Sequence, residues 1–487
     1  MKLKMIAVIT VAAAAFVAPA PGLIGVDDAK AASSQTSATF AICTVCVENG
    51  GDLSRHGYVT LNAWQHDQIA KIRASSPETK ILVYKDMSST RSYACKNGLD
   101  AALLPAGVGY CWAEQNAPDW FTRDSAGNRI EWKYFAGHWQ MDIGTQAYQD
   151  AWATNVLAEL NVYGWDGVVI DNANVDPRSY FNDRSSIEYP SQGDYAAATR
   201  SFLARVGPRL MSAGFLVLPN IQANPVLAGD ELWADWIQFT SGGVREYWMK
   251  WGTDGTGRFG GGGWEDLQRV FFEVQKAGKV FLTSVYGSVS DVQTMRWVRA
   301  SFLVGWNGGS AAIAYEPANG VEMWHPEWTF EIGSPIGQRY RMGGAWRRDF
   351  SGGTAIANPS SSAQIVSLGL GYAHPDGRAV SLVTLAPLTG IVLRALGRAP
   401  QTPAAAPSPA PVTADPATRT SSVARKETRR IAAVTAPASF RRWAAWYTGT
   451  GGYAKSKRHP RVRPAVPARI PKAWWRDLVR LTAASRG

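Results

Sequence analysis

The sequence predicts a (β/α)₈ barrel, expected to span 39–345, followed by a small C-terminal β-structure and a disordered basic tail. Short β-branched or apolar runs alternate with amphipathic stretches eight times over about 290 residues, which is the length and rhythm of this barrel. The run at 167–170 is almost wholly apolar, as expected of a strand buried on both faces. A doubly wound open sheet is the alternative, but it often carries a Gly-rich nucleotide loop, which the sequence lacks.

Two periodicities define the expected elements: apolar positions at helical spacing predict helices, and short runs between turn residues predict strands. The expected barrel strands span 39–45, 80–84, 138–143, 167–170, 215–218, 233–240, 280–285 and 311–315. The helices span 61–73, 145–163, 194–213, 264–277 and 290–303. Runs broken by Gly, Asn and Pro at 354–357, 364–368, 379–385 and 390–396 predict a small β-domain at 346–397.

The N-terminus has the pattern of a secretory signal. Lys2 and Lys4 precede an apolar run at 5–17, and small residues favour cleavage after Ala31. We therefore expect residues 1–31 to be a signal peptide and the protein to be secreted or associated with the cell wall. An uncleaved anchor is the alternative, although the run is short for a bilayer, and we expect no transmembrane segment after signal cleavage.

The net charge of +11 comes from the C-terminal tail. A Pro/Ala-rich linker at 398–418 precedes residues 419–487, which hold 17 Lys and Arg, two acidic residues and several Trp, so the rest of the chain carries about −4. This mildly acidic body gives no reason to expect nucleic-acid binding. We expect the tail to bind an anionic cell-wall polymer, and nucleic-acid binding by its interleaved Arg and Trp is the weaker alternative.

Four cysteines fit an oxidising compartment. Cys95 and Cys111 flank a loop that contains Gly, and we expect them to form a disulfide. Cys43 and Cys46 have the C-x-x-C spacing of redox or zinc sites, but no βαβ redox context or His pair accompanies them. A second disulfide or two free thiols is the expectation there, and we expect neither a metal nor a cofactor.

Carboxylates end several of the expected strands, which is where a (β/α)₈ barrel carries its chemistry. Asp171 follows the apolar fourth strand and is the strongest catalytic candidate, and Glu246 follows the sixth. The candidates for contact with the substrate are Asp86, Asp142, Asn172, Asn220 and Glu316. Glycosidic cleavage needs one group that protonates the leaving oxygen and a second that attacks or activates water, which two carboxylates supply.

Other reaction classes have weaker support in the sequence. The chain has six His, no H-E-x-x-H and no G-x-S-x-G, so neither zinc-protease nor serine-hydrolase chemistry is indicated. An acid at a strand end can instead cap a helix or pair with Arg, as Arg245 could pair with Glu246. The 21 Trp are mostly expected in the core, but Trp112 and Trp139, in or after the long loop at 85–133, are candidates for stacking on sugar rings.

Several segments resemble the family known as hypothetical glycosyl hydrolase family 15. They are LNAW at 61–64, VYKD at 83–86, DGVVIDN at 166–172, EIGSP at 331–335, RDFSGG at 348–353 and ANP at 357–359. The resemblance covers roughly 39–397 and implies a TIM-barrel glycosidase. The wider group of α-galactosidase-like barrels implies an Asp nucleophile after the fourth strand and an acid/base from the sixth, which here are Asp171 and Glu246. The resemblance implies no particular substrate.

Two functions remain as hypotheses. The first is a secreted glycoside hydrolase that cleaves an extracellular or cell-envelope polysaccharide by two-carboxylate acid/base chemistry. The second is a non-catalytic carbohydrate- or cell-wall-binding protein whose barrel is inactive. A second carboxylate at catalytic distance from Asp171 separates them. A carboxyl separation of about 5–5.5 Å favours a retaining reaction and about 6.5–9.5 Å an inverting one.

Overall fold

The computed structural model describes residues 38–43, 47, 51–181, 185–221, 225–251, 257–317, 328 and 330–397. The expected signal peptide, linker and basic tail lie outside these ranges, as do the side chains of Cys43 and Cys46. Within the ranges that are described, no helix is both long and apolar enough to cross a membrane.

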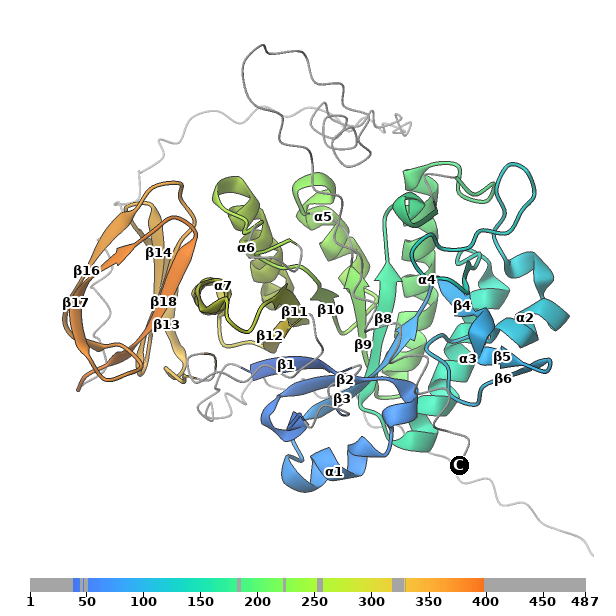
Figure 1. The fold of residues 1–487 in the computed structure, drawn as a ribbon, viewed down its shortest axis with the longest axis horizontal. Helices are drawn as coiled ribbons and strands as arrows, with labels where there is room; N and C mark the ends of the chain where they lie inside the picture. The colour runs from blue at the N-terminus through green and yellow to red at the C-terminus, as the bar shows by residue number, and fades with distance from the viewer. Residues whose placement is uncertain are drawn as a thin grey trace, which may run out of the picture. The chain divides into compact units, whose positions relative to one another are not determined.

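Eight parallel strands close into a barrel in the order β1-β12-β11-β10-β9-β8-β3-β2 (Figure 1). They are β1 (Ala38–Cys43), β2 (Tyr58–Leu61), β3 (Lys80–Asp86), β8 (Gly167–Ala173), β9 (Leu216–Ile221), β10 (Gly242–Arg245), β11 (Val280–Gly287) and β12 (Ala311–Pro317). The prediction of a (β/α)₈ barrel is confirmed. One buried apolar cluster takes residues from seven of these strands, including Phe40, Leu82, Val169, Leu218 and Leu282.

Helices cover the outside of the barrel (Figure 1). They are α1 (Gln68–Ser75), α3 (Gln146–Tyr163), α4 (Gln192–Ser212), α5 (Pro225–Ile237), α6 (Gly261–Lys276) and α7 (Val292–Gly305), with the short α2 (Tyr110–Asn116) in the loop after β3. Local signals define their starts: Ser191 and Asp194 form a capping box on α4, and Asp291 accepts from the Thr294 N–H at the start of α7. The residues between strands and helices form the largest apolar cluster.

Two of the expected barrel strands are wrong. The run at 138–143 contains β7 (His138–Gln140), which pairs with β4 (Ser89–Arg91) in a separate two-stranded antiparallel sheet. The run at 233–240 lies mostly in α5, where Trp233, Trp236 and Ile237 are buried at helical spacing. A short apolar run does not reveal its hydrogen-bonding partner, so the strand signal was ambiguous at both places.

The missing barrel strands are β2 and β10, each of four residues. Leu61 of β2 falls within the first predicted helix, at 61–73, and is a strand residue instead. The first half of β10 is Gly242-Gly243, a pair with low intrinsic preference for strands. Tertiary contact requires glycine there, because a Cβ on Gly242 would lie 1.9 Å from the carbonyl oxygen of Val280 in the neighbouring strand.

A six-stranded antiparallel sheet follows the barrel in the order β13-β14-β15-β18-β16-β17. The strands are β13 (Pro335–Met342), β14 (Ala345–Phe350), β15 (Gly353–Asn358), β16 (Gln364–Ala373), β17 (Ala379–Leu385) and β18 (Thr389–Ala395). The sheet therefore begins at Pro335, earlier than the predicted boundary at 346. It packs on α7 so closely that a Cβ on Gly390 of β18 would lie 2.5 Å from the Cβ of Ala300.

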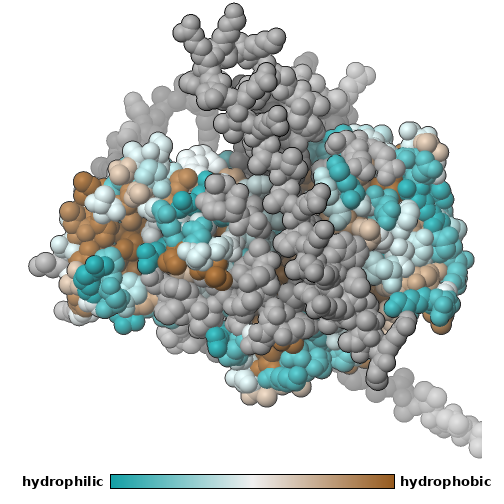
Figure 2. Space-filling model, viewed as in Figure 1, coloured by the Kyte–Doolittle hydropathy of each residue, from teal (hydrophilic) through white to brown (hydrophobic). Residues whose placement is uncertain are grey.

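The outer strands of this sheet carry exposed apolar side chains. Ile365 of β16 is 71% exposed and Leu382 of β17 is 55% exposed. Figure 2 shows the hydrophobic surface that gathers over this part of the sheet.

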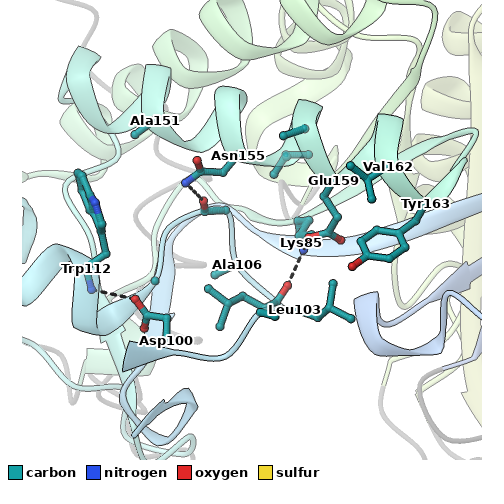
Figure 3. Close-up of a pocket in the computed structure, with 16 residues that line it drawn as sticks. Lys85, Asp100, Leu103, Ala106, Trp112, Ala151, Asn155, Glu159, Val162 and Tyr163 are labelled. Atoms are coloured by element: carbon teal, nitrogen blue, oxygen red, sulfur yellow. Dashed lines mark hydrogen bonds and ion pairs between the residues drawn. The ribbon is translucent and has the colours of Figure 1, made fainter. Parts of the chain in front are cut away.

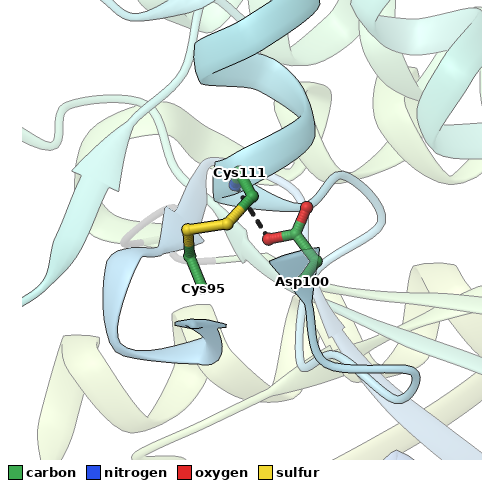
Figure 4. Close-up of side chains that lie close together, drawn as sticks. All are labelled: Cys95, Asp100 and Cys111. Carbon is green, nitrogen blue, oxygen red and sulfur yellow. Dashed lines mark hydrogen bonds between the residues drawn. A yellow bond between two sulfur atoms is a disulfide. The ribbon is translucent and has the colours of Figure 1, made fainter. Parts of the chain in front are cut away.

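The loop between β3 and α3 is held by a disulfide between Cys95 and Cys111, whose Cα atoms lie 5.3 Å apart (Figure 4). This separation is within the reach of a disulfide, and the pairing is the one predicted from the sequence. Asp100 lies beside the bridge and accepts hydrogen bonds from the backbone N–H groups of Cys111 and Trp112 at the start of α2. The loop is thus closed by a covalent bond and by the cap of its short helix.

Candidate active site

The carboxyl ends of the barrel strands bring one set of polar side chains together. Side chains along a strand alternate between its two faces, so a residue two positions after a core residue continues the same face. Val169 of the interior cluster is followed in this way by Asp171, and Leu218 by Asn220. The same step leads from Leu82, Val244, Leu282 and Ala314 to Tyr84, Glu246, Ser284 and Glu316. The interior changes from apolar to polar where the strands end.

Asp171 is half-buried and accepts four hydrogen bonds. Tyr84 donates its hydroxyl to Oδ2 at 2.6 Å, and the Asn172 amide donates to the same oxygen at 3.4 Å. The Asn172 backbone N–H and the Asn220 side-chain amide donate to Oδ1 at 2.8 and 3.0 Å. Donors on both oxygens stabilise the ionised form of the carboxyl and hold it in one orientation.

Asn220 joins Asp171 to Glu246. Its Nδ2 atom donates to Oδ1 of Asp171 at 3.0 Å and to Oε2 of Glu246 at 3.0 Å. The reverse orientation of this amide would place its oxygen against two carboxylate oxygens, so the nitrogen must face them. Because both hydrogen bonds share one nitrogen, the two carboxylate oxygens are at most twice 3.0 Å apart. If the two N–H bonds diverge by the ~120° of a planar amide, that separation is about 5 Å.

Glu246 follows β10 and is half-buried. The Tyr286 hydroxyl, from β11, donates to its Oε1 atom at 2.7 Å. Burial and the charge of Glu246 raise the pKa of Tyr286, so the phenol stays protonated and acts as a donor. Arg245 does not form the ion pair that the sequence allowed with Glu246. Its guanidinium lies on the other face of β10 and donates to the Ile221 carbonyl at 3.4 Å.

The electrostatics of the site act mainly on Asp171. Burial, the neighbouring charge of Glu246 and the charge of Asp86 raise the pKa of Asp171 to about 6, against the smaller opposite effects of the hydrogen bonds from Tyr84 and Asn220. Two carboxylates that face each other cannot both ionise easily, because each charge disfavours the other. A raised pKa at such a pair is typical of catalytic carboxylates.

Asn172 supports Asp171 through its backbone. Its φ of 64° is in the left-handed region, which Asn adopts more readily than most residues. This conformation turns the Asn172 N–H back toward Oδ1 of Asp171. The contact that the structure shows for Asn172 is therefore with Asp171, and its expected contact with substrate stays a prediction.

The carboxylates of Asp86 and Asp142 accept hydrogen bonds from other residues of the protein. Asp86 is fully buried and accepts from Ser88, Ser89 and Arg91, with the Arg91 guanidinium 2.8 Å from Oδ2. The 138–143 run does not join the barrel, so Asp142 lies before α3 instead. There its Oδ2 accepts from the Thr145 hydroxyl at 2.6 Å and its Oδ1 from Tyr189. Neither carboxylate has an oxygen that is free of protein donors.

Glu316 and the two predicted Trp residues lie in different places. Glu316 is half-buried at the end of β12 and accepts from the Ile42 N–H at 3.0 Å, on the barrel rim. Trp139 is half-buried on β7, with its ring centroid 6.3 Å from that of Tyr110. Trp112 is 46% exposed and lines a cavity of about 510 Å³ between α3 and the loop before α2.

That cavity is distinct from the cluster around Asp171. Figure 3 shows Trp112 at one end and Tyr163 at the other, with Lys85 and Glu159 between them. Lys85 points away from the barrel interior and donates to Glu159 of α3 at 2.6 Å, whereas Tyr84, the preceding residue, points toward Asp171. This cavity thus lies outside the barrel wall.

Sequence reasoning missed the tyrosines of the site. Tyr84 and Tyr286 lie at the ends of barrel strands, in the same kind of position as the carboxylates. The strand-end rule that selected Asp171 would have selected them too, had it been applied to hydroxyl donors as well as to acids. Tyr247 and Trp251, which follow Glu246, carried no signal beyond their proximity in sequence.

A family model agrees with the resemblance in sequence. The model of hypothetical glycosyl hydrolase family 15 matches residues 73–354. No curated protein matches the chain.

Similar folds occur among solved structures. The glycoside hydrolase domain of PelA from Pseudomonas aeruginosa aligns with 15% identity and a TM-score of 0.37, over 57% of this chain and 92% of that one. Ega3 of Aspergillus fumigatus in complex with galactosamine aligns with 11% identity and a TM-score of 0.36, over 59% and 94%. An α-amylase from Geobacillus thermoleovorans aligns with 10% identity and a TM-score of 0.39, over 74% and 98%.

The family match spans more than half of the 487 residues and includes β3, β8, β9 and β10, the strands that position Tyr84, Asp171, Asn220 and Glu246. The chain belongs to hypothetical glycosyl hydrolase family 15 and is thus a glycoside hydrolase.

Proposed function

We propose that the protein is a secreted enzyme that cleaves glycosidic bonds of an extracellular or cell-envelope polysaccharide, with Asp171 and Glu246 as its catalytic pair. One observation carries this proposal: the Asn220 amide spans the two carboxylates with hydrogen bonds of 3.0 Å each. Such a bridge sets both the distance and the relative orientation of two groups that must act on the same bond. The signal-like N-terminus supports secretion.

Asp171 is the better nucleophile of the two. Its four donors stabilise a negative charge and hold the carboxylate still, which a nucleophile needs. Its pKa of about 6 leaves it mostly ionised at pH 7. We assign Glu246 the role of acid and base because it is the second carboxylate of the pair, joined to Asp171 through the Asn220 amide.

The short separation favours a retaining reaction. In the first step the Asp171 carboxylate attacks the anomeric carbon while Glu246 gives its proton to the leaving oxygen, so that a glycosyl ester forms and the glycosidic bond breaks. In the second step the Glu246 carboxylate takes a proton from water, the water oxygen bonds to the anomeric carbon, and Asp171 is released. A separation of about 5 Å leaves too little room for the water that an inverting enzyme places between its carboxylates.

A screen on isolated envelope and extracellular polysaccharides tests the proposal, with products identified by mass spectrometry and their anomeric configuration by NMR. We expect retained configuration. Asp171→Asn should lower kcat by about a thousandfold or more, because the amide cannot attack. Asp150→Asn is the matched control, because Asp150 forms a surface ion pair with Arg205. Binding without hydrolysis, unchanged in Asp171→Asn, would replace this proposal with a non-catalytic wall-binding protein.

A further inference from the structure

The segment that follows Glu246 has an unusual backbone. Tyr247 and Met249 both have positive φ, at 55° and 61°, which is uncommon for any residue with a side chain. A bulky residue in this region costs on the order of 1–2 kcal/mol. Two such residues within three positions, directly after a catalytic carboxylate, point to a structure that is held for a purpose other than stability.

The core holds this segment in place. Trp248 and Met249 are fully buried, and the Trp248 ring contacts Phe271, Phe281 and Phe302. Lys250 is also buried and donates to the Tyr286 carbonyl at 2.9 Å. These anchors supply the burial that offsets the backbone strain.

The two residues at the ends of the segment are more exposed to solvent than the three residues between them. Tyr247 is half-buried and Trp251 is 52% exposed, yet their ring centroids lie 4.7 Å apart. Trp251 therefore leaves half of its large apolar surface in water, although three adjacent residues of the same segment are buried. An exposed Trp contributes little to folding, but its open face can stack on a ligand.

These rings form a continuous series that starts at the catalytic acid. Tyr286 donates to Glu246, the Tyr286 ring lies 5.0 Å from that of Tyr247, and the Tyr247 ring lies 4.7 Å from that of Trp251. The first ring of the series, Tyr286, lies on the side of Glu246 that is remote from Asp171, because β11 follows β10, β9 and β8 in the strand order.

We propose that Tyr247 and Trp251 form a sugar-binding platform for the leaving-group side of the substrate, and that they stack on the C–H face of an unsubstituted pyranose unit. The inference rests on the proposed function. In a retaining pair the nucleophile lies under the anomeric carbon and the acid lies beside the leaving oxygen. The direction from Asp171 to Glu246 is thus the direction from the retained sugar to the leaving sugar. Tyr286, which packs against Tyr247, lies on the next strand in that direction.

Binding is measured by calorimetry in an Asp171→Asn background, which removes turnover, with the oligosaccharide that the polysaccharide screen identifies. Adding Trp251→Ala should weaken binding about tenfold, since a ring contact of this kind is worth about 1.4 kcal/mol. Trp251→Phe should restore most of the affinity, because it keeps an aromatic face. Phe272→Ala, which removes a 43% exposed ring from α6, is the matched control and should bind as the parent does.

A second measurement separates this platform from the rest of the site. With Asp171 intact, Trp251→Ala should hydrolyse a glycosyl fluoride of the same sugar, which has no leaving sugar, within about twofold of wild type, and lose about tenfold in kcat/KM on the oligosaccharide. Equal losses on both substrates would refute the leaving-group assignment, and no loss on either would refute the platform. A parent enzyme that hydrolyses neither substrate would contradict the proposed function instead.

Discussion

Replacing Asp171 by Asn should stabilise the fold at neutral pH while it abolishes activity. Burial, then Glu246, then Asp86 raise the pKa of Asp171 from 3.8 to about 6. A carboxyl whose pKa is higher in the folded protein than in the unfolded chain binds its proton more tightly when folded. Its favourable effect on folding is therefore complete below about pH 4 and is lost as the pH rises through 6.

The magnitude follows from the shift. Each pKa unit is worth about 1.4 kcal/mol, so ionisation of Asp171 costs the fold about 3 kcal/mol above pH 7. Asn carries no charge and avoids this cost. Its oxygen can still accept from the Asn172 backbone N–H and from Asn220, and its amide can donate to the Tyr84 oxygen. The Tyr84 proton and the more distant Asn172 side-chain amide then lose their acceptor. Subtracting about 1 kcal/mol for that loss, and allowing for partial exposure, we expect a net gain of about 1–2 kcal/mol at pH 8.

Urea denaturation of the wild type and of Asp171→Asn at pH 4 and pH 8 measures this effect. The variant should be the more stable protein at pH 8 and no more stable than wild type at pH 4. Asp150→Asn controls for the loss of a surface carboxylate that Arg205 pairs. If Asp171→Asn destabilises the protein equally at both pH values, the charge of Asp171 is not under strain and the reasoning from its raised pKa is wrong.

Three further predictions follow from the same structure. The kcat/KM for a glycosyl fluoride should fall below about pH 6, as Asp171 takes up a proton. Glu246→Gln should move this fall to lower pH, because it removes a charge that raises the pKa of Asp171. A kcat/KM that falls above pH 6 instead would make Asp171 the acid. Replacing Cys95 and Cys111 by Ser should lower the free energy of unfolding by about 3 kcal/mol in chemical denaturation, because the disulfide closes a loop of 16 residues. An unchanged free energy of unfolding would show that the loop keeps its structure without the disulfide. Truncation after Gly397 should leave activity and melting temperature unchanged but weaken retention on teichoic-acid-like anionic polymers; an unfolded product would show that the boundary is misplaced.

The sequence by itself determined the barrel and identified Asp171 as its strongest catalytic candidate. The prediction of a (β/α)₈ barrel was correct although two strands were misplaced, because the apolar periodicity of the other elements is compatible with few other folds. Asp171 was identifiable because an almost wholly apolar strand ends in an acid, and burial of that strand is a local property of its residues. The family model, which matches 73–354, agrees with the glycosidase reaction class inferred from the sequence.

Tertiary structure alone decided which polar groups meet. β10 became a strand through its neighbours and not through its own four residues, as Gly242 shows by its close approach to Val280. Asp86 and Asp171 are both acids at strand ends, yet Asp86 is fully buried beside Arg91 and Asp171 faces Glu246. The Asn220 bridge joins residues 26 and 49 positions away from it in the chain. Such contacts depend on the register and closure of the barrel, which no local pattern encodes, because hydrogen bonding and charge act across space and not along the chain.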